Sequence, residues 1–113
     1  MEKLQELLEQ CLGQNFVHMI ISNPRKSDAA RKIDVRPYDE RGTIRFQFAE
    51  YRNNQVFHQN RTKEEALEQI LRLLAATYRQ MEFRTTQKQY TVLVSKKGKV
   101  TIKARQEISG IYP

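Results

Sequence analysis

Apolar and polar residues alternate most regularly between Thr43 and Tyr51, where the sequence reads TIRFQFAEY. A period of two residues is typical of a β-strand with one buried side and one solvent-facing side. The apolar side consists of Ile44, Phe46 and Phe48, and the other side of Arg45, Gln47 and Ala49. Because the aromatic side needs an apolar layer to cover it, and the leucine-rich segments at 4–12 and 66–78 are able to supply one, the pattern predicts a sheet backed by two helices.

Both leucine-rich segments repeat with the 3.6-residue period of an amphipathic helix. The first is predicted to run from Glu2 to Leu12, and Gly13 is expected to end it in a left-handed cap conformation. The second, from Thr62 to Gln80, opens with TKEE, in which the Thr62 hydroxyl and the Glu65 carboxylate can each satisfy a backbone N–H. Its apolar face is the wider one, so we expect it to be the main helix under the sheet.

Three further stretches read as strands, at Phe16 to Ser22, Lys32 to Tyr38 and Gln55 to Asn60. Turns at 39–42 and 53–54 would join the last two of these to the 43–51 strand, with Gly42 free to adopt a positive φ.

The register of the first of these hairpins follows from its apolar side. Val35 is expected opposite Phe46 or Phe48, because a slip of one residue would set it against Gln47. Pro37 has no N–H to donate, so either its strand lies at an edge or the end of that strand is leaving the ladder.

The clearest hairpin runs from Tyr90 to Arg105, after a polar connector that follows Met81 and Phe83. A three-residue loop, Lys96-Lys97-Gly98, is predicted as a turn followed by a left-handed glycine. This loop would pair Val94 with Val100, Val92 with Ile102 and Tyr90 with Ala104. Together the elements predict an α+β fold, a hairpin-rich antiparallel sheet of about six to seven strands backed on one face by two helices. We expect one domain over residues 1–108, with 109–113 a truncated linker.

The chain is basic, with 20 lysines and arginines against 13 acids and a net charge of +7. From Arg84 to Arg105 there are seven basic residues and no acid. Such an excess attracts polyanions, although lysines on exposed strands also serve to keep a sheet edge from aggregating. If the apolar residues of the strands face the helices, the cations that alternate with them point to the opposite face of the sheet. The lysines of the 96–98 loop and Lys99 would form a basic hairpin tip beside that face. The predicted nucleic-acid-binding residues are Arg36, Arg45, Lys96, Lys97, Lys99, Lys103 and Arg105.

Several chemistries find no support in the residues. His18 and His58 lie on different predicted strands without clustered acids or a second cysteine, so no metal site is expected. The acid pairs at 39–40 and 64–65 already serve a turn and a helix start, and the four single glycines form no phosphate-binding loop. We therefore expect no catalytic, metal or cofactor-binding residue in this chain.

The cysteine content and the hydropathy of the chain indicate where in the cell the protein is located. The single cysteine, Cys11, is expected to be a buried and unreactive thiol, which fits a reducing cytosol. No stretch of about 18 apolar residues is present to cross a membrane. We expect a cytoplasmic protein.

Three segments resemble the N-terminal region of a group of bacterial class I SAM-dependent methyltransferases that are often predicted to act on RNA. They are LGQNFVHMIISNPRK at 12–26, QVFHQNRTKEE at 55–65 and VLVSKKGKVTIK at 92–103. The resemblance spans almost the whole chain. It implies an accessory domain that presents a substrate, structured RNA, to a Rossmann-like catalytic domain following in the same protein. SAM is expected only in that C-terminal domain, so the resemblance assigns neither SAM binding nor methyl transfer to any residue here.

Two other classes of function stay open. A protein interaction or dimerisation module would use an exposed sheet edge or the Leu93 side of the last hairpin, and could form a homodimer. A small self-contained enzyme would need a cluster of titratable groups that the sequence does not bring together.

Overall fold

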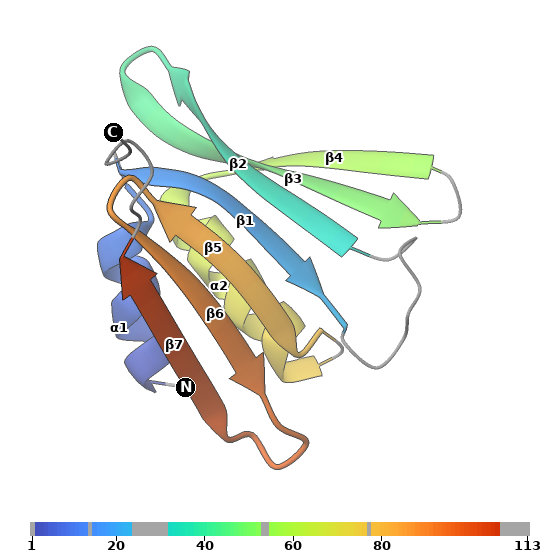
Figure 1. Ribbon diagram of the computed structural model, residues 1–113. Helices are drawn as coiled ribbons and strands as arrows, with labels where there is room; N and C mark the ends of the chain where they lie inside the picture. Colours follow the sequence, from blue (N-terminus) through green and yellow to red (C-terminus); the bar gives the residue numbers. More distant parts are fainter. Residues whose placement is uncertain (1, 14, 24–31, 53–54, 77, 107–113) are drawn as a thin grey trace, which may run out of the picture.

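The computed structural model of the protein describes residues 2–13, 15–23, 32–52, 55–76 and 78–106 (Figure 1). Two helices and seven strands occur within these ranges. In chain order they are α1 (Glu2–Cys11), β1 (Phe16–Ser22), β2 (Lys32–Glu40), β3 (Thr43–Arg52), β4 (Gln55–Arg61), α2 (Lys63–Ala76), β5 (Gln80–Thr85), β6 (Lys88–Val94) and β7 (Val100–Gln106).

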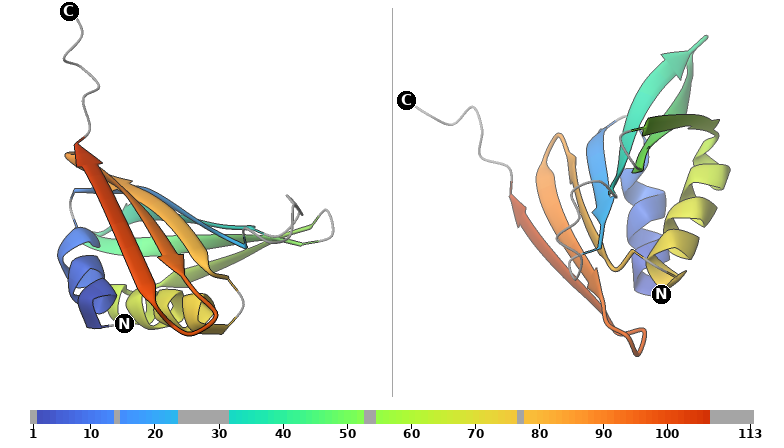
Figure 2. Two further views of the ribbon diagram at one scale, coloured as in Figure 1. Left: turned by 60° about the horizontal axis from the view of Figure 1, so that its bottom comes forward. Right: turned by 90° about the vertical axis from the view of Figure 1, so that its right-hand side faces the viewer.

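The strands form one antiparallel sheet in the order β4-β3-β2-β1-β5-β6-β7. Strand β1 lies in the middle, with the meander β2-β3-β4 on one side and the meander β5-β6-β7 on the other. Both helices cover the same face of the twisted sheet and leave the opposite face open (Figure 2). The predicted α+β class, with its antiparallel sheet backed on one face by two helices, is confirmed.

The core lies between the helices and the covered face. Burial of aromatic and aliphatic side chains is the main stabilising term here, at roughly 25 cal/mol per Å² of apolar surface. The rings of Phe16 and Phe46 meet edge to face with their centroids 5.8 Å apart. Side chains with no more than 2% of their surface exposed come from both helices and from five of the strands, and include Leu4, Leu8, Leu12, Met19, Ile21, Val35, Phe46, Phe48, Ile70, Leu74, Met81, Phe83 and Val92.

The predicted registers are confirmed. Val35 lies opposite Phe48, one of the two partners expected for it. In the last hairpin Val94 pairs with Val100, Val92 with Ile102 and Tyr90 with Ala104. Its loop closes with the Gly98 N–H donating to the Ser95 carbonyl at 2.9 Å, and Gly98 has the expected positive φ of 84°.

The predicted start of α2 is also confirmed. The backbone N–H of Thr62 donates to Glu65 Oε1 at 2.9 Å, and the Glu65 N–H donates to Thr62 Oγ1 at 3.2 Å. These two hydrogen bonds satisfy donors that the first turn of a helix cannot use internally.

Two helix ends were predicted wrongly. Gly13 is not in the left-handed region. After α1 the Leu12 N–H still bonds the Leu8 carbonyl at 2.9 Å, and the Gly13 N–H then turns back to the Cys11 carbonyl, also at 2.9 Å. This turn leaves Leu12 fully buried and directs the chain into β1 without a left-handed cap.

Helix α2 ends at Ala76, not at Gln80. Tyr78 is buried outside the helix, with its N–H bonded to the Leu73 carbonyl at 3.0 Å. Gln80 already pairs with Ser22 on one side and Leu93 on the other, as the first residue of β5. Cross-strand pairing on both sides therefore overrides the helical period in these residues, and the connector predicted before Tyr90 is largely strand.

The strand predicted at 32–38 continues to Glu40, and Pro37 lies on its far half, opposite Phe46 of β3. Strand β1 pairs with β2 only from Lys32 to Val35. Pro37 therefore falls where β2 has left β1, the second of the two explanations that its missing N–H allowed. The turn predicted at 53–54, the boundary at 108 and the linker predicted at 109–113 lie outside the described residues.

Candidate nucleic-acid interface

The open face of the sheet carries a continuous line of polar side chains, one from each strand. We call this line the polar row, and its members are Asn60, Gln47, Arg36, His18, Arg84, Gln89 and Arg105. The registers put Gln47 opposite both Asn60 and Arg36, and Gln89 opposite both Arg84 and Arg105. His18 lies opposite Arg84, and the β1–β2 register carried one residue further sets it beside Arg36. With neighbouring strands about 4.8 Å apart, the row extends for about 29 Å.

His18 reaches the open face because of an irregularity in β1. The register of β1 against β5 shifts between Phe16 and His18. As a result Phe16 and Met19, three positions apart, both point into the core, and His18 points to the opposite side. His18 Nε2 lies 2.7 Å from Oδ1 of Asp34, whose residue is only 8% exposed. This contact fixes the imidazole in the middle of the polar row.

A shallow hollow of about 200 Å³ lies over the middle of the row, lined by His18, Ile20, Glu82, Phe83, Arg84 and Gln89. Arg84 is exposed. At the far end of the row, Arg105 Nη2 donates to Gln89 Oε1 at 3.0 Å, which holds the guanidinium over β6. The two arginines therefore lie on either side of Gln89, about 10 Å apart across two strand spacings. Glu82 is the one acid among the residues that line the hollow.

The structure separates the predicted binding residues into groups. Lys103 and Arg105 lie on β7 with their side chains on the open face, whereas Lys96, Lys97 and Lys99 are exposed at the β6–β7 hairpin tip. Lys99 and Arg105 are six positions apart in the sequence, which is about 20 Å along a strand. The tip therefore extends the basic surface along β7, at right angles to the polar row.

Arg36 and Arg45 lie on the other half of the sheet, on β2 and β3. Four strand spacings, about 19 Å, separate Arg36 from β7. Arg36 is exposed, but Arg45 Nε donates to Glu40 Oε2 at 2.7 Å, and this ion pair offsets its charge. Of these two residues, Arg36 is the one that joins the polar row.

Sequence reasoning missed five members of the polar row, namely Asn60, Gln47, His18, Arg84 and Gln89. For Arg84 a signal was present, since Met81, Phe83 and Thr85 alternate with Gln80, Glu82 and Arg84 as in a strand. For His18 no such signal existed, because its direction depends on where β1 shifts against β5.

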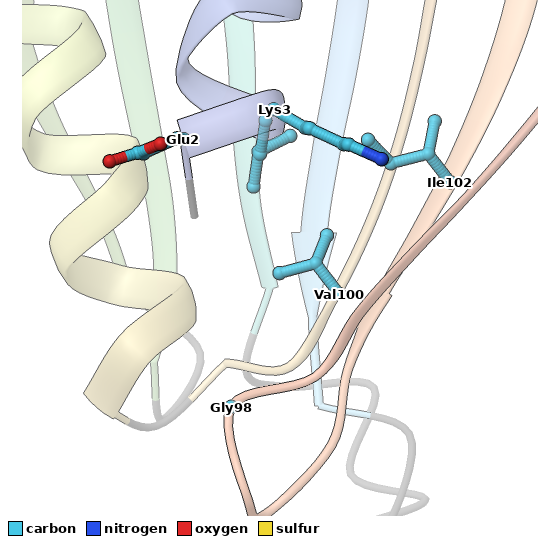
Figure 3. A pocket seen from close by; sticks show the side chains of 6 residues that line it. Glu2, Lys3, Gly98, Val100 and Ile102 are labelled. Carbon is cyan, nitrogen blue, oxygen red and sulfur yellow. The ribbon is translucent and has the colours of Figure 1, made fainter.

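A larger hollow, of about 610 Å³, lies on the covered side between the start of α1 and β7 (Figure 3). Val100 and Ile102 form its apolar floor, the Lys3 side chain extends toward Ile102, and Glu2 points away toward α2. One lysine and one glutamate directed apart make neither an acid–base pair nor a metal site.

The described residues include no cluster of three or more His, Cys, Asp or Glu side chains suited to a metal ion. Burial raises the pKa of the Cys11 thiol above its ordinary value of 9.0, despite opposing effects of a hydrogen bond with Tyr90 and of the Lys88 charge. Desolvation likewise raises the pKa of Tyr90. Within the described part of the chain, no helix has the length and apolar character needed to span a membrane.

Comparison with known proteins gives no relative from which a function could be transferred: no family model, no curated protein and no solved structure matches this chain. The surface just described, together with the sequence segments at 12–26, 55–65 and 92–103, is therefore the basis for a proposed function.

Proposed function

We propose that the open face of the sheet binds RNA, and that the chain acts as the N-terminal substrate-recognition domain of a SAM-dependent methyltransferase. The observation that carries the RNA part is the polar row, which offers Arg36, Arg84 and Arg105 at intervals of about 10 Å on an exposed, uncovered face. The methyltransferase part rests on the family resemblance of the sequence. No residue of this chain is assigned to SAM or to catalysis.

The chemistry of the open face favours contact with phosphates over reading of bases. Sheets that read single-stranded RNA stack bases on aromatic rings of their central strands. Here, in the described part of the open face, the tyrosines are Tyr38 on β2 and Tyr51 on β3, and Lys32 Nζ already lies 5.6 Å from the Tyr51 ring centroid. The central strands β1 and β5 present His18, Ile20, Glu82 and Arg84 instead. We therefore expect affinity for the shape and charge of a structured RNA, with little dependence on sequence.

The test is a titration of a fluorescent stem–loop RNA at several salt concentrations, with wild-type chain and three variants. Arg84→Gln/Arg105→Gln removes two cations from the polar row. Lys96→Gln/Lys97→Gln/Lys99→Gln removes the three cations of the hairpin tip. Lys3→Gln/Lys63→Gln on α1 and α2 is the control matched in charge to the first variant, since both side chains are exposed on the covered side.

Loss of two phosphate contacts should flatten the slope of log K against log salt by about 1.4 to 1.8, at about 0.7 to 0.9 per phosphate. The tip variant should flatten the slope by the equivalent of one to three phosphate contacts, and the control should leave the slope unchanged. Equal losses in the row variant and the control would mean that net charge alone causes the binding. A wild-type chain that shows no salt-dependent binding would refute the proposal.

A further inference from the structure

Strand β4 (Gln55–Arg61) ends the sheet next to β3. An end strand has backbone N–H and C=O groups along its outer edge that no strand of its own sheet can satisfy, and such an edge readily pairs with another strand. Six of the seven residues of β4 are exposed. Its register against β3 runs without a shift from Gln55 to Arg61, so no bulge interrupts this edge.

The composition of β4 lacks the usual protection of an end strand. Proteins discourage edge pairing with charged side chains, prolines or bulges. Strand β7, at the other end of the sheet, carries Lys103 and Arg105. The first six residues of β4, QVFHQN, include no lysine, acid or proline. Its one cation, Arg61, is turned to α2, with Nε donating to Gln69 Oε1 and Nη2 to Gln59 Oε1, both at 2.8 Å.

Strand β4 also displays apolar surface. Among the described residues, the large hydrophobic side chains that are exposed are Val56 at 45%, Phe57 at 41% and Leu93 at 40%. Two of these three are neighbours on β4. By the registers, Val56 is on the open face beside Tyr51, and Phe57 is on the helix-covered face beside Glu50. A strand added at this edge would cover apolar surface on both faces.

We propose that β4 pairs antiparallel with β4 of a second copy of this chain, so that the two sheets join into one. An uncharged strand does not repel its own copy, whereas two β7 strands would bring four cations together. A strongly acidic or basic partner would find no complementary charge along QVFHQN. This pairing does not depend on RNA binding.

The surface beside β4 is self-complementary in charge. A hollow of about 360 Å³ runs between β4 and α2, and its charged residues are Arg61, Glu65, Glu68 and Arg72. Two cations and two carboxylates balance one another, although the chain as a whole carries +7. Glu68 and Arg72 pair within one helix. A two-fold axis through the β4 pair sets α2 antiparallel to its copy, so that Glu68 of one chain and Arg72 of the other can also pair.

The geometry of an antiparallel pair fixes how the two open faces relate. The two-fold axis stands perpendicular to the sheet, so both open faces lie on the same side. The two polar rows then belong to one surface about twice as wide as that of a single chain.

Sedimentation equilibrium of the chain tests the pairing. The wild type should show twice the chain mass of 13.4 kDa. Val56→Lys/His58→Lys sets like charges across the two-fold axis and should restore the mass of one chain. The control Thr91→Lys/Leu93→Lys adds the same charge to the open face of β6, which is not an end strand and lies far from β4, and should leave the dimer intact.

Circular dichroism of both variants should show the wild-type spectrum, because Val56, His58 and Leu93 are exposed and Thr91 is partly so. A wild-type chain with the mass of one copy up to about 1 mM, where association would be worth about 4 kcal/mol, overturns the proposal. It is equally overturned if the β4 variant stays dimeric. Either result leaves the RNA proposal standing, since Arg84 and Arg105 are tested separately.

Discussion

Leu74 lies on α2 with none of its side chain exposed, in contact with the covered face of the sheet. Leu74→Ala removes buried carbons that are worth about 0.8 kcal/mol each by transfer alone, or about 2 kcal/mol in total. The cavity that remains adds to this loss, and Leu→Ala substitutions in cores cost about 2 to 5 kcal/mol. For a domain of this size such a loss should lower the melting temperature by about 10 °C or more.

Urea denaturation followed by circular dichroism measures this cost. The midpoint should fall and the slope of the transition should stay the same, as it does when only native stability changes. The control is Arg45→Ala on the open face, where an exposed ion pair with Glu40 is worth at most about 1 kcal/mol. If the two variants lost the same stability, α2 would not cover the face that carries Phe46 and Val35.

Two further predictions concern α2 and the single cysteine. Thr62→Ala should lower the free energy of unfolding by about 1 kcal/mol, measured by urea denaturation, because it removes the acceptor of the Glu65 N–H. Thr62→Ser keeps a hydroxyl and should stay near the wild-type stability. Equal losses of stability in the two variants would show that the cap contributes nothing. Because burial raises the pKa of Cys11, the folded chain holds the thiol proton more tightly than the unfolded chain does. The contribution of this proton to the free energy of unfolding is therefore complete at a pH below the unfolded pKa, and it is lost as the pH rises through the folded pKa. Iodoacetamide should alkylate Cys11 much more slowly in the folded chain than in urea at pH 8, and equal rates would contradict its burial.

Most of the fold could be predicted because its local signals agree with its pairing. In β3 the alternation of Ile44, Phe46 and Phe48 coincides with the buried side, and at Gly98 the loop itself fixes the register of β6 against β7. The end of α2 could not be predicted in this way. Leu74 and Tyr78 are four residues apart, as on one helix face, yet Tyr78 is buried just as well after the helix has ended.

The candidate site was harder to predict than the fold for a related reason. Each cation of β7 could be assigned to the open face from its own strand. The polar row also depends on which strands are neighbours, and β1 pairs with β5 from a distant part of the chain. Arg84 belongs to the row only because β5 lies between β1 and β6.

The central position of β1 has a consequence for how the protein folds. Each meander, β2-β3-β4 and β5-β6-β7, consists of contacts between neighbours in the sequence, which close quickly. Strand β1 pairs with its sequence neighbour β2 on one side. On the other side it pairs with β5, where Gln80 lies opposite Ser22, and helix α2 comes between these two strands in the sequence. The edge of β1 that faces β5 therefore stays unpaired until β5 (Gln80–Thr85) is available. We therefore expect the step that joins the two meanders across β1 to limit the rate of folding, because long-range loop closure has to be overcome there.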